Sequence, residues 1–182
     1  MSRLTIDRPR YCPDREFPPY THVPGETPHP THDPEGHSYP GKPRNMEPLD
    51  IDDWRENEEY LYAIDLFNHG YYWEAHEVWE GLWHAHGREG TTAAFLQGLI
   101  KLAAAGVKVL QETDPGVTTH ATRAAELFEQ VQRETGTVRY AGMNLEHLIA
   151  FAKSVAGGSP EWEWGVQEKV IPVFDDPLPM TG

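Results

Sequence analysis

Residues 91–113 read TTAAFLQGLIKLAAAGVKVLQET, and this stretch decides the fold class. Its apolar residues recur at positions 95, 99, 102, 106, 109 and 110, the spacing of one face of an amphipathic helix. The small residues at positions 103–106 would let the backbone of a neighbouring helix approach closely. The stretch therefore predicts a long helix that packs tightly against at least one other helix.

Four further helices are predicted around this stretch, over about residues 52–69, 72–86, 118–134 and from residue 144 onward. Glycine follows each of them, at Gly70, Gly87, Gly136 and the pair Gly157-Gly158, as is usual at helix C-termini. Asp114-Pro115-Gly116 is predicted to end the helix over 91–113. No stretch alternates convincingly between apolar and polar residues as a strand would. Short connections between amphipathic helices favour an all-α fold, an antiparallel bundle of about five helices.

Residues 1–48 differ in composition from the rest of the chain, because they hold eleven of its sixteen prolines. Proline lacks an N–H and fixes φ, so this segment is predicted to be an extended arm. Because disordered segments are usually poor in aromatic residues and this arm contains several, we expect it to lie on the body of the protein. Its histidines are His22, His29, His32 and His37. Residues 49–182 are predicted to form the helical bundle domain, with a short irregular tail after Ile171.

The composition argues against several classes of function. The 15 Lys and Arg residues are outnumbered by 29 Asp and Glu, and a net charge of −14 disfavours binding to nucleic acid or to an anionic membrane. No run of eighteen apolar residues and no signal-peptide pattern is present. Cys12 is the only cysteine, so no intramolecular disulfide can form. We expect a cytoplasmic protein of one domain, and leave open whether it forms a homo-oligomer.

The helix predicted over 72–86 carries the residues most typical of a functional site. On a helical wheel His76, Glu80 and Trp83 form one ridge at the margin between core and solvent. The core-facing stripe contains Ala75, Val78, Trp79 and Leu82, and the predicted solvent side contains Glu74, Glu77, Gly81 and His84. His84 and His86 are expected to be solvated.

His76 and Glu80 are one helical turn apart, so both side chains can reach a single metal ion. Imidazole nitrogen and carboxylate oxygen are ordinary ligands of zinc and similar divalent ions. A catalytic zinc site commonly has three protein ligands, so a third would have to come from another helix or from the arm, where His29, His32 and His37 are candidates. The simpler interpretation is a hydrogen-bonded His76–Glu80 pair that fastens the helix, with Trp83 as ordinary packing.

Two blocks of sequence resemble a known family. Residues 67–83 read FNHGYYWEAHEVWEGLW, and residues 95–104 read FLQGLIKLAA. Both are similar to the hallmarks of domain-of-unknown-function family 309, a small helical family marked by H-x-x-x-E-x-x-W, here His76, Glu80 and Trp83. The resemblance implies a helical bundle and a role for these three residues beyond packing. The family has no established activity, although members are sometimes labelled metal-dependent hydrolases.

Three functions are compatible with these patterns. The first is a metal-dependent hydrolase of a small molecule, in which His76 and Glu80 bind the ion, Glu77 is a candidate base and Trp83 walls the pocket. The second is a non-catalytic module that binds a small molecule or a partner helix, with Trp83 among its aromatic contacts. The third is a structural pair without a ligand. The residues do not identify the substrate or the metal.

Overall fold

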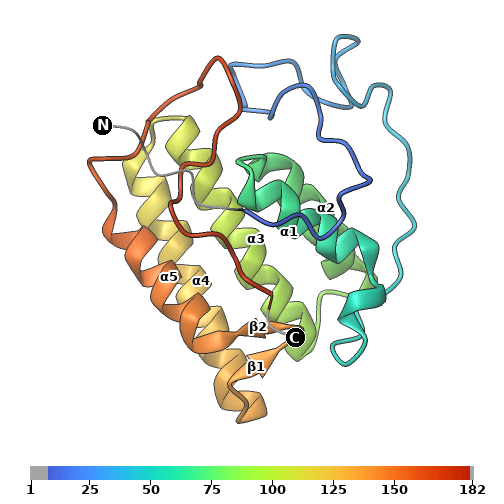
Figure 1. Cartoon of the computed structure of the whole chain (residues 1–182), viewed down its shortest axis with the longest axis vertical. Coiled ribbons are helices and arrows are strands. Elements are labelled where there is room, and N and C mark those ends of the chain that lie inside the picture. The colour runs from blue at the N-terminus through green and yellow to red at the C-terminus, as the bar shows by residue number, and fades with distance from the viewer. Residues whose placement is uncertain (1–7, 181–182) are drawn as a thin grey trace.

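The computed structural model describes residues 8–180, which form five α-helices, one 3-10 turn and a two-stranded ladder (Figure 1). In chain order the elements are η1 (Trp54–Glu56), α1 (Glu58–Asn68), α2 (Tyr72–Ala85), α3 (Thr91–Leu110), α4 (Asp114–Thr135), β1 (Arg139–Tyr140), β2 (Met143–Asn144) and α5 (Leu145–Gly157). The all-α prediction is confirmed. Residues 1–7 of the predicted arm and residues 181–182 of the tail lie outside the described residues.

One predicted helix boundary is wrong. Asp114-Pro115-Gly116 does not end a helix but opens α4, with the proline in the first turn. The N–H groups of a first turn have no partner within the helix, so a proline there loses no hydrogen bond. The other end of α4 follows the prediction, because Gly136 adopts a left-handed conformation with φ of 66° directly after the helix.

The first predicted helix is interrupted near its start. Trp54 belongs to the short turn η1, and the chain becomes extended at Asn57. The Asn57 side chain accepts a hydrogen bond from the Tyr60 N–H at 2.9 Å and so caps α1. Asn144 caps α5 in the same way. It also ends the short antiparallel ladder of β1 and β2, which is too short to leave an alternating pattern in the sequence.

Helix α3 runs through the middle of the bundle and packs against both α2 and α4 (Figure 1). Helix α1 contacts α2, and α5 contacts α4. Gly106 makes the close approach of α3 to α2 possible, since a Cβ atom at this position would lie 2.4 Å from Cγ of Tyr72. By length and composition α3 alone among the described helices is apolar enough to cross a membrane, yet 72% of its most apolar window is buried inside the protein.

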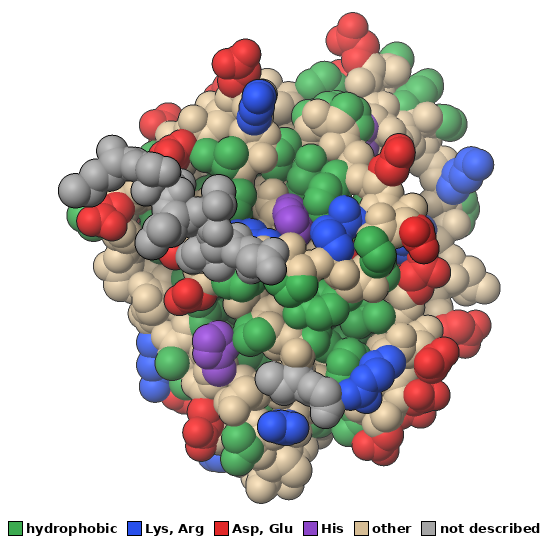
Figure 2. All heavy atoms as spheres, in the orientation of Figure 1, with side chains coloured by type: hydrophobic (Ala, Val, Ile, Leu, Met, Phe, Trp, Pro, Cys, Tyr) green, Lys and Arg blue, Asp and Glu red, His purple; other side chains and the backbone are tan. Residues whose placement is uncertain are grey.

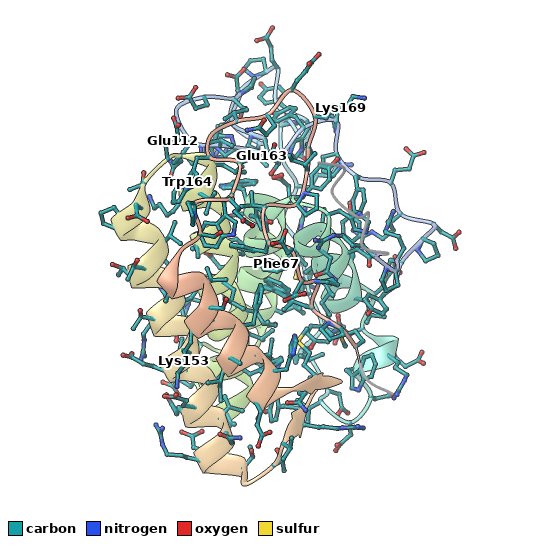
Figure 3. The ribbon with its side chains drawn as sticks, turned by 60° about the vertical axis from the view of Figure 1, so that its left-hand side comes forward. Phe67, Glu112, Lys153, Glu163, Trp164 and Lys169 are labelled. Carbon is teal, nitrogen blue, oxygen red and sulfur yellow. The ribbon has the colours of Figure 1, made fainter. Side chains whose placement is uncertain are left out.

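The arm and the tail both lie against the helices. In Figure 1 the arm passes around α1 and α2, and the tail runs back across α3. Asn68 holds the tail through two hydrogen bonds with the main chain of Leu178, at 3.1 and 2.7 Å. The Tyr72 hydroxyl accepts N–H hydrogen bonds from Val173 and Phe174. Figure 3 shows Phe67 beneath this tail, where its ring packs against Phe174 with centroids 5.8 Å apart.

Two buried carboxylates hold the arm. Asp65, which is fully buried in α1, accepts hydrogen bonds from the N–H groups of Tyr11 and Cys12 at 2.8 Å and from Arg10 Nε at 3.0 Å. Glu74, near the start of α2, accepts from the N–H of His22. The remaining acidic side chains are largely at the surface, and Figure 2 shows many of them around the rim of one face. The buried polar residues of α1 and α2 thus serve mainly to bind segments outside the helices.

Candidate functional site

Three side chains of α2 converge within one helical turn. His76 Nδ1 lies 3.4 Å from Glu77 Oε1 and 3.6 Å from Glu80 Oε2. One ligand atom from each of the three residues can be chosen so that all lie within 4.8 Å of one another. The His76 side chain is 27% exposed and that of Glu80 39%, so the ridge lies between core and solvent. We call His76, Glu77 and Glu80 the α2 cluster.

The two distances from His76 Nδ1 are long for hydrogen bonds and are compatible with a shared divalent ion. His76 Nδ1 is itself inaccessible to solvent and has no hydrogen-bond partner. Two atoms bound to one tetrahedral zinc ion at about 2.0–2.1 Å are about 3.4 Å apart, close to the two distances from Nδ1. One imidazole and two carboxylates are also an ordinary donor set for zinc or manganese. The donor types of these three residues are thus those that would hold such an ion.

The third member of the cluster is Glu77, from the same helix, rather than a residue of the arm. The sequence wheel had placed Glu77 toward solvent as a candidate base, whereas its Oε1 atom faces His76. His29, His32 and His37 do not belong to the cluster. An imidazole and a carboxylate at adjacent positions can still approach each other, because both side chains are long enough to bend toward the same side.

His84 extends the cluster along α2. Its Nε2 atom lies 3.5 Å from Glu80 Oε1, and its Nδ1 atom accepts a hydrogen bond from Arg88 Nη2 at 2.9 Å. An imidazole that accepts at Nδ1 carries its proton on Nε2, where it faces the Glu80 carboxylate. His84 is thus exposed, as predicted, but it has partners on both sides. It constrains the position of Glu80.

Trp83 packs as the structural interpretation of the His76–Glu80 pair expects. Its partly buried ring packs against the hydrophobic core and meets the His84 ring edge-on, with centroids 5.5 Å apart. The Arg88 guanidinium lies 5.5 Å from the ring centre. Trp83 does not line the cavity between α2 and the arm. Its contact with the His84 ring instead helps to hold His84 in position.

A cavity of about 420 Å³ separates α2 from the arm. Glu77 and Glu80 of the α2 cluster face it, together with Glu74, Gly81 and His84 from the same helix. The arm supplies the opposite wall, which includes Arg15, Pro30, His37, Lys42 and Arg44. Its volume lies within the usual range for small-molecule sites, about 300–1,000 Å³. The α2 cluster is therefore at the edge of a space large enough for a small ligand.

Glu74 is a correction to the sequence analysis. It was predicted to face solvent, but it is only 6% exposed because the arm covers it. Its two carboxylate oxygens accept from the His22 N–H at 3.1 Å, and Oε2 also accepts from the Thr21 hydroxyl at 3.4 Å. The helical wheel could not reveal this burial, because it contains no information about segments distant in sequence.

The arm histidines gather on the same side of α2 without forming a metal-ligand cluster. The rings of His22 and His29 both meet Trp73 edge-on, and His29 stacks on His32 with centroids 4.2 Å apart. His37 stands apart and lines the cavity. The sequence places these histidines in the arm but does not reveal their partners Trp73 and Glu74. The concentration of histidines and aromatic residues in the arm was the available signal that this segment has specific contacts.

His86 is also a correction, since it was predicted to be solvated. Its Nε2 atom accepts a hydrogen bond from the Leu49 N–H at 2.9 Å, which fastens the segment before η1 to the end of α2. Burial lowers the pKa of His86, and burial is also the main cause of the lowered pKa values of His22, His69 and His120. All four rings thus favour the neutral form in the folded protein.

The folded protein should consequently lose stability between pH 7.5 and pH 5.5. A histidine whose pKa is lower in the folded state binds its proton more readily when unfolded, so its contribution is present above about pH 6.5 and declines below it. We expect the urea midpoint of the metal-free protein to be lower at pH 5.5 than at pH 7.5. His86→Gln should reduce this difference, and His147→Gln, at an exposed position of α5, should not. A midpoint that is the same at both pH values would contradict this assignment.

The protein is thus a small helical bundle with a histidine–carboxylate cluster beside a cavity. Residues 60–119, from α1 to the start of α4, match the family model described as Domain of unknown function (DUF309). The resemblance noted in the sequence is confirmed over this segment, which contains the α2 cluster. No curated protein matches the chain. The arm and α5 lie outside the matched residues.

Proposed function

We propose that the protein is a metal-dependent hydrolase of a small molecule and that the α2 cluster binds its divalent ion. The observation that carries the proposal is the solvent-inaccessible, unpartnered Nδ1 atom of His76, with carboxylate oxygens of Glu77 and Glu80 at 3.4 and 3.6 Å. Three protein ligands are the number typical of catalytic zinc sites, whereas structural zinc sites usually have four.

The ion, when bound, would supply Lewis-acid chemistry that makes a water molecule more acidic and a substrate more electrophilic. His76 Nδ1, Glu77 Oε1 and Glu80 Oε2 would hold it. His84, placed by Arg88, would keep the Glu80 carboxylate oriented. Glu77 lines the cavity, and no hydrogen bond to its Oε2 atom is formed within residues 8–180, so this oxygen would be the one to accept a proton there.

The metal content of the purified protein tests the proposal. We expect about one equivalent of zinc or manganese per chain in wild-type protein purified without chelators and incubated with the ion. His76→Ala and Glu80→Ala should each lower this occupancy at least about tenfold, because losing one of three ligands removes much of the binding free energy. His147→Ala and Glu146→Ala are matched controls, since they remove the same residue types from the exposed face of α5.

The outcomes separate the three functions. Metal that is absent from the wild type after incubation with zinc, manganese and iron, or fully retained in His76→Ala, would refute the metal site. Metal lost in both variants, together with metal-dependent turnover of ester, amide or phosphate substrates, would support the hydrolase. Metal binding without turnover would instead favour a binding module. A lower melting temperature of His76→Ala with no metal in any sample would indicate a structural pair.

A further inference from the structure

The two walls of the cavity differ in charge. The α2 wall presents Glu74, Glu77 and Glu80 at three-residue intervals, whereas the arm contributes Lys42 and Arg44. Glu74 already accepts hydrogen bonds from the arm, and the other two carboxylates belong to the α2 cluster. The three carboxylates of the cavity therefore already have partners, in the arm or within the α2 cluster, whereas the basic side chains of the arm remain to be paired.

Lys42 and Arg44 are exposed at the cavity, and neither forms an ion pair with a carboxylate anywhere in the described part of the chain. Arg15, the third cation of the cavity wall, is engaged already. Its guanidinium lies 3.2 Å from Glu59 Oε1 and packs over the Tyr62 ring at 3.8 Å. Two cations thus remain for a ligand.

His37 is the buried polar group of this wall. Its side chain is 4% exposed and its position is fixed, because Nδ1 is paired with the Ser38 hydroxyl at 2.8 Å and the ring packs on Tyr20. The other ring nitrogen, Nε2, has no hydrogen-bond partner and lies 3.9 Å from Glu74 Oε2. Buried polar atoms in proteins are nearly always hydrogen-bonded, so an unpaired Nε2 on a residue that lines a cavity points to a ligand atom as its partner.

We infer that the arm completes the substrate site and that the substrate carries an anionic group, a phosphate or a carboxylate. His37 Nε2–H would donate to this group, in the tautomer in which the Ser38 hydroxyl donates to Nδ1, and Lys42 and Arg44 would neutralise it. The reacting end of the molecule would lie toward Glu77 and Glu80. The position of the reacting end rests on the proposed function. The contacts to the anionic group involve residues of the arm alone.

Calorimetric titration of the full chain with three probes tests this inference. Phenyl phosphate and benzoate carry the two candidate anions on the same ring, and benzyl alcohol is a neutral analogue. We expect saturable binding of at least one anion and much weaker binding of benzyl alcohol. The double variant K42A/R44A should raise the Kd of that anion at least about tenfold, and His37→Ala about fivefold or more, since charge-assisted hydrogen bonds are among the strongest.

His37→Gln retains a donor and should weaken binding less than His37→Ala. Lys153→Ala removes a lysine from the outer face of α5 (Figure 3) and should leave the Kd unchanged. Melting temperatures of all variants establish that the arm substitutions leave the protein folded. Equal Kd values for the wild type, K42A/R44A and His37→Ala would overturn the inference, as would the absence of saturable anion binding in the wild type.

Metal content, measured on the same samples, separates the two proposals. Wild-type protein that takes up no metal, yet binds an anion in an arm-dependent way, would refute the hydrolase and support the anion site. Protein that holds metal at the α2 cluster but binds both anions independently of His37, Lys42 and Arg44 would leave the metal site intact and refute the role of the arm. The relative Kd values of phenyl phosphate and benzoate then identify which anion the site prefers.

Discussion

Asp65→Ala is expected to lower the free energy of unfolding by about 3–5 kcal/mol, the usual cost of removing one partner of a buried ion pair. The Asp65 carboxylate is fully buried, and it binds the Arg10 side chain together with the N–H groups of Tyr11 and Cys12. Its loss would leave these donors without an acceptor in a partly buried site. The carboxylate is also the main tie between α1 and the beginning of the arm.

Chemical unfolding in urea and alkylation of Cys12 provide two independent measurements. Burial, followed by the charge of Asp65, raises the pKa of the Cys12 thiol to about 11, so we expect slow alkylation in the native protein at pH 8. Asp65→Ala should accelerate alkylation, because it loosens the arm and removes a nearby negative charge. The lone cysteine makes the reaction a specific probe of this end of the arm.

Asp14→Ala is the matched control for Asp65→Ala. Asp14 belongs to the same part of the arm, but it is exposed and has no hydrogen bond or ion pair to any residue from 8 to 180. We expect its replacement to change stability by less than about 0.5 kcal/mol, as is usual for isolated surface positions. Similar urea midpoints for the two variants would show that the buried carboxylate does not anchor the arm.

Gly106→Ala is the second substitution with a large expected effect. The added Cβ would lie 2.4 Å from Cγ of Tyr72, which is the fixed base of the ring rather than a mobile end. Overpacking of this kind costs about 1–3 kcal/mol and sometimes more, which outweighs the gain of about 1 kcal/mol in helix propensity. Displacement of Tyr72 would also withdraw its hydroxyl from the N–H groups of Val173 and Phe174. The destabilisation should therefore reach the tail.

The same substitution at Gly157 should not destabilise the protein. Gly157 is the last residue of α5, and a Cβ there would meet no atom within 4 Å. Gly157→Ala should consequently be neutral or slightly stabilising in urea unfolding. Limited proteolysis should cleave the tail faster in Gly106→Ala than in the wild type. Equal urea midpoints for Gly106→Ala and Gly157→Ala would contradict this prediction, because they would mean that α2 and α3 can move apart without loss of stability.

Local sequence patterns predicted the helices well, because each helix has its own periodic apolar face and its own terminating residue. Helix α2, predicted over 72–86, spans Tyr72–Ala85, and Gly136 ends α4 as expected. There were two exceptions: the first helix begins later than predicted, at Glu58, and Asp114-Pro115-Gly116 opens a helix, since the same residues that stop one helix can start the next. A proline between two helices is compatible with the end of the first helix and with the first turn of the second. Local sequence does not distinguish these two positions.

The environment of the site was less accessible to sequence reasoning. Spacing along α2 correctly brought His76 near Glu80, because an interaction over one turn depends only on local geometry. The burial of Glu74 and the hydrogen bond of His86 depend instead on segments 37 to 53 positions away in the chain. A helical wheel treats everything outside the helix as solvent. It therefore predicted solvent exposure for Glu74, which the arm covers, and for His86, which binds the segment before η1.

The attachment of the arm through main-chain N–H groups constrains how its sequence can change. Tyr11, Cys12 and His22 each donate a backbone hydrogen bond to a buried carboxylate. Any replacement of suitable size retains that hydrogen bond except proline, which has no amide hydrogen. Proline occupies eleven of the first 48 positions but none of these three. The residue that makes the arm extended is thus incompatible with the positions that attach it, and related chains should vary in side chain there while avoiding proline.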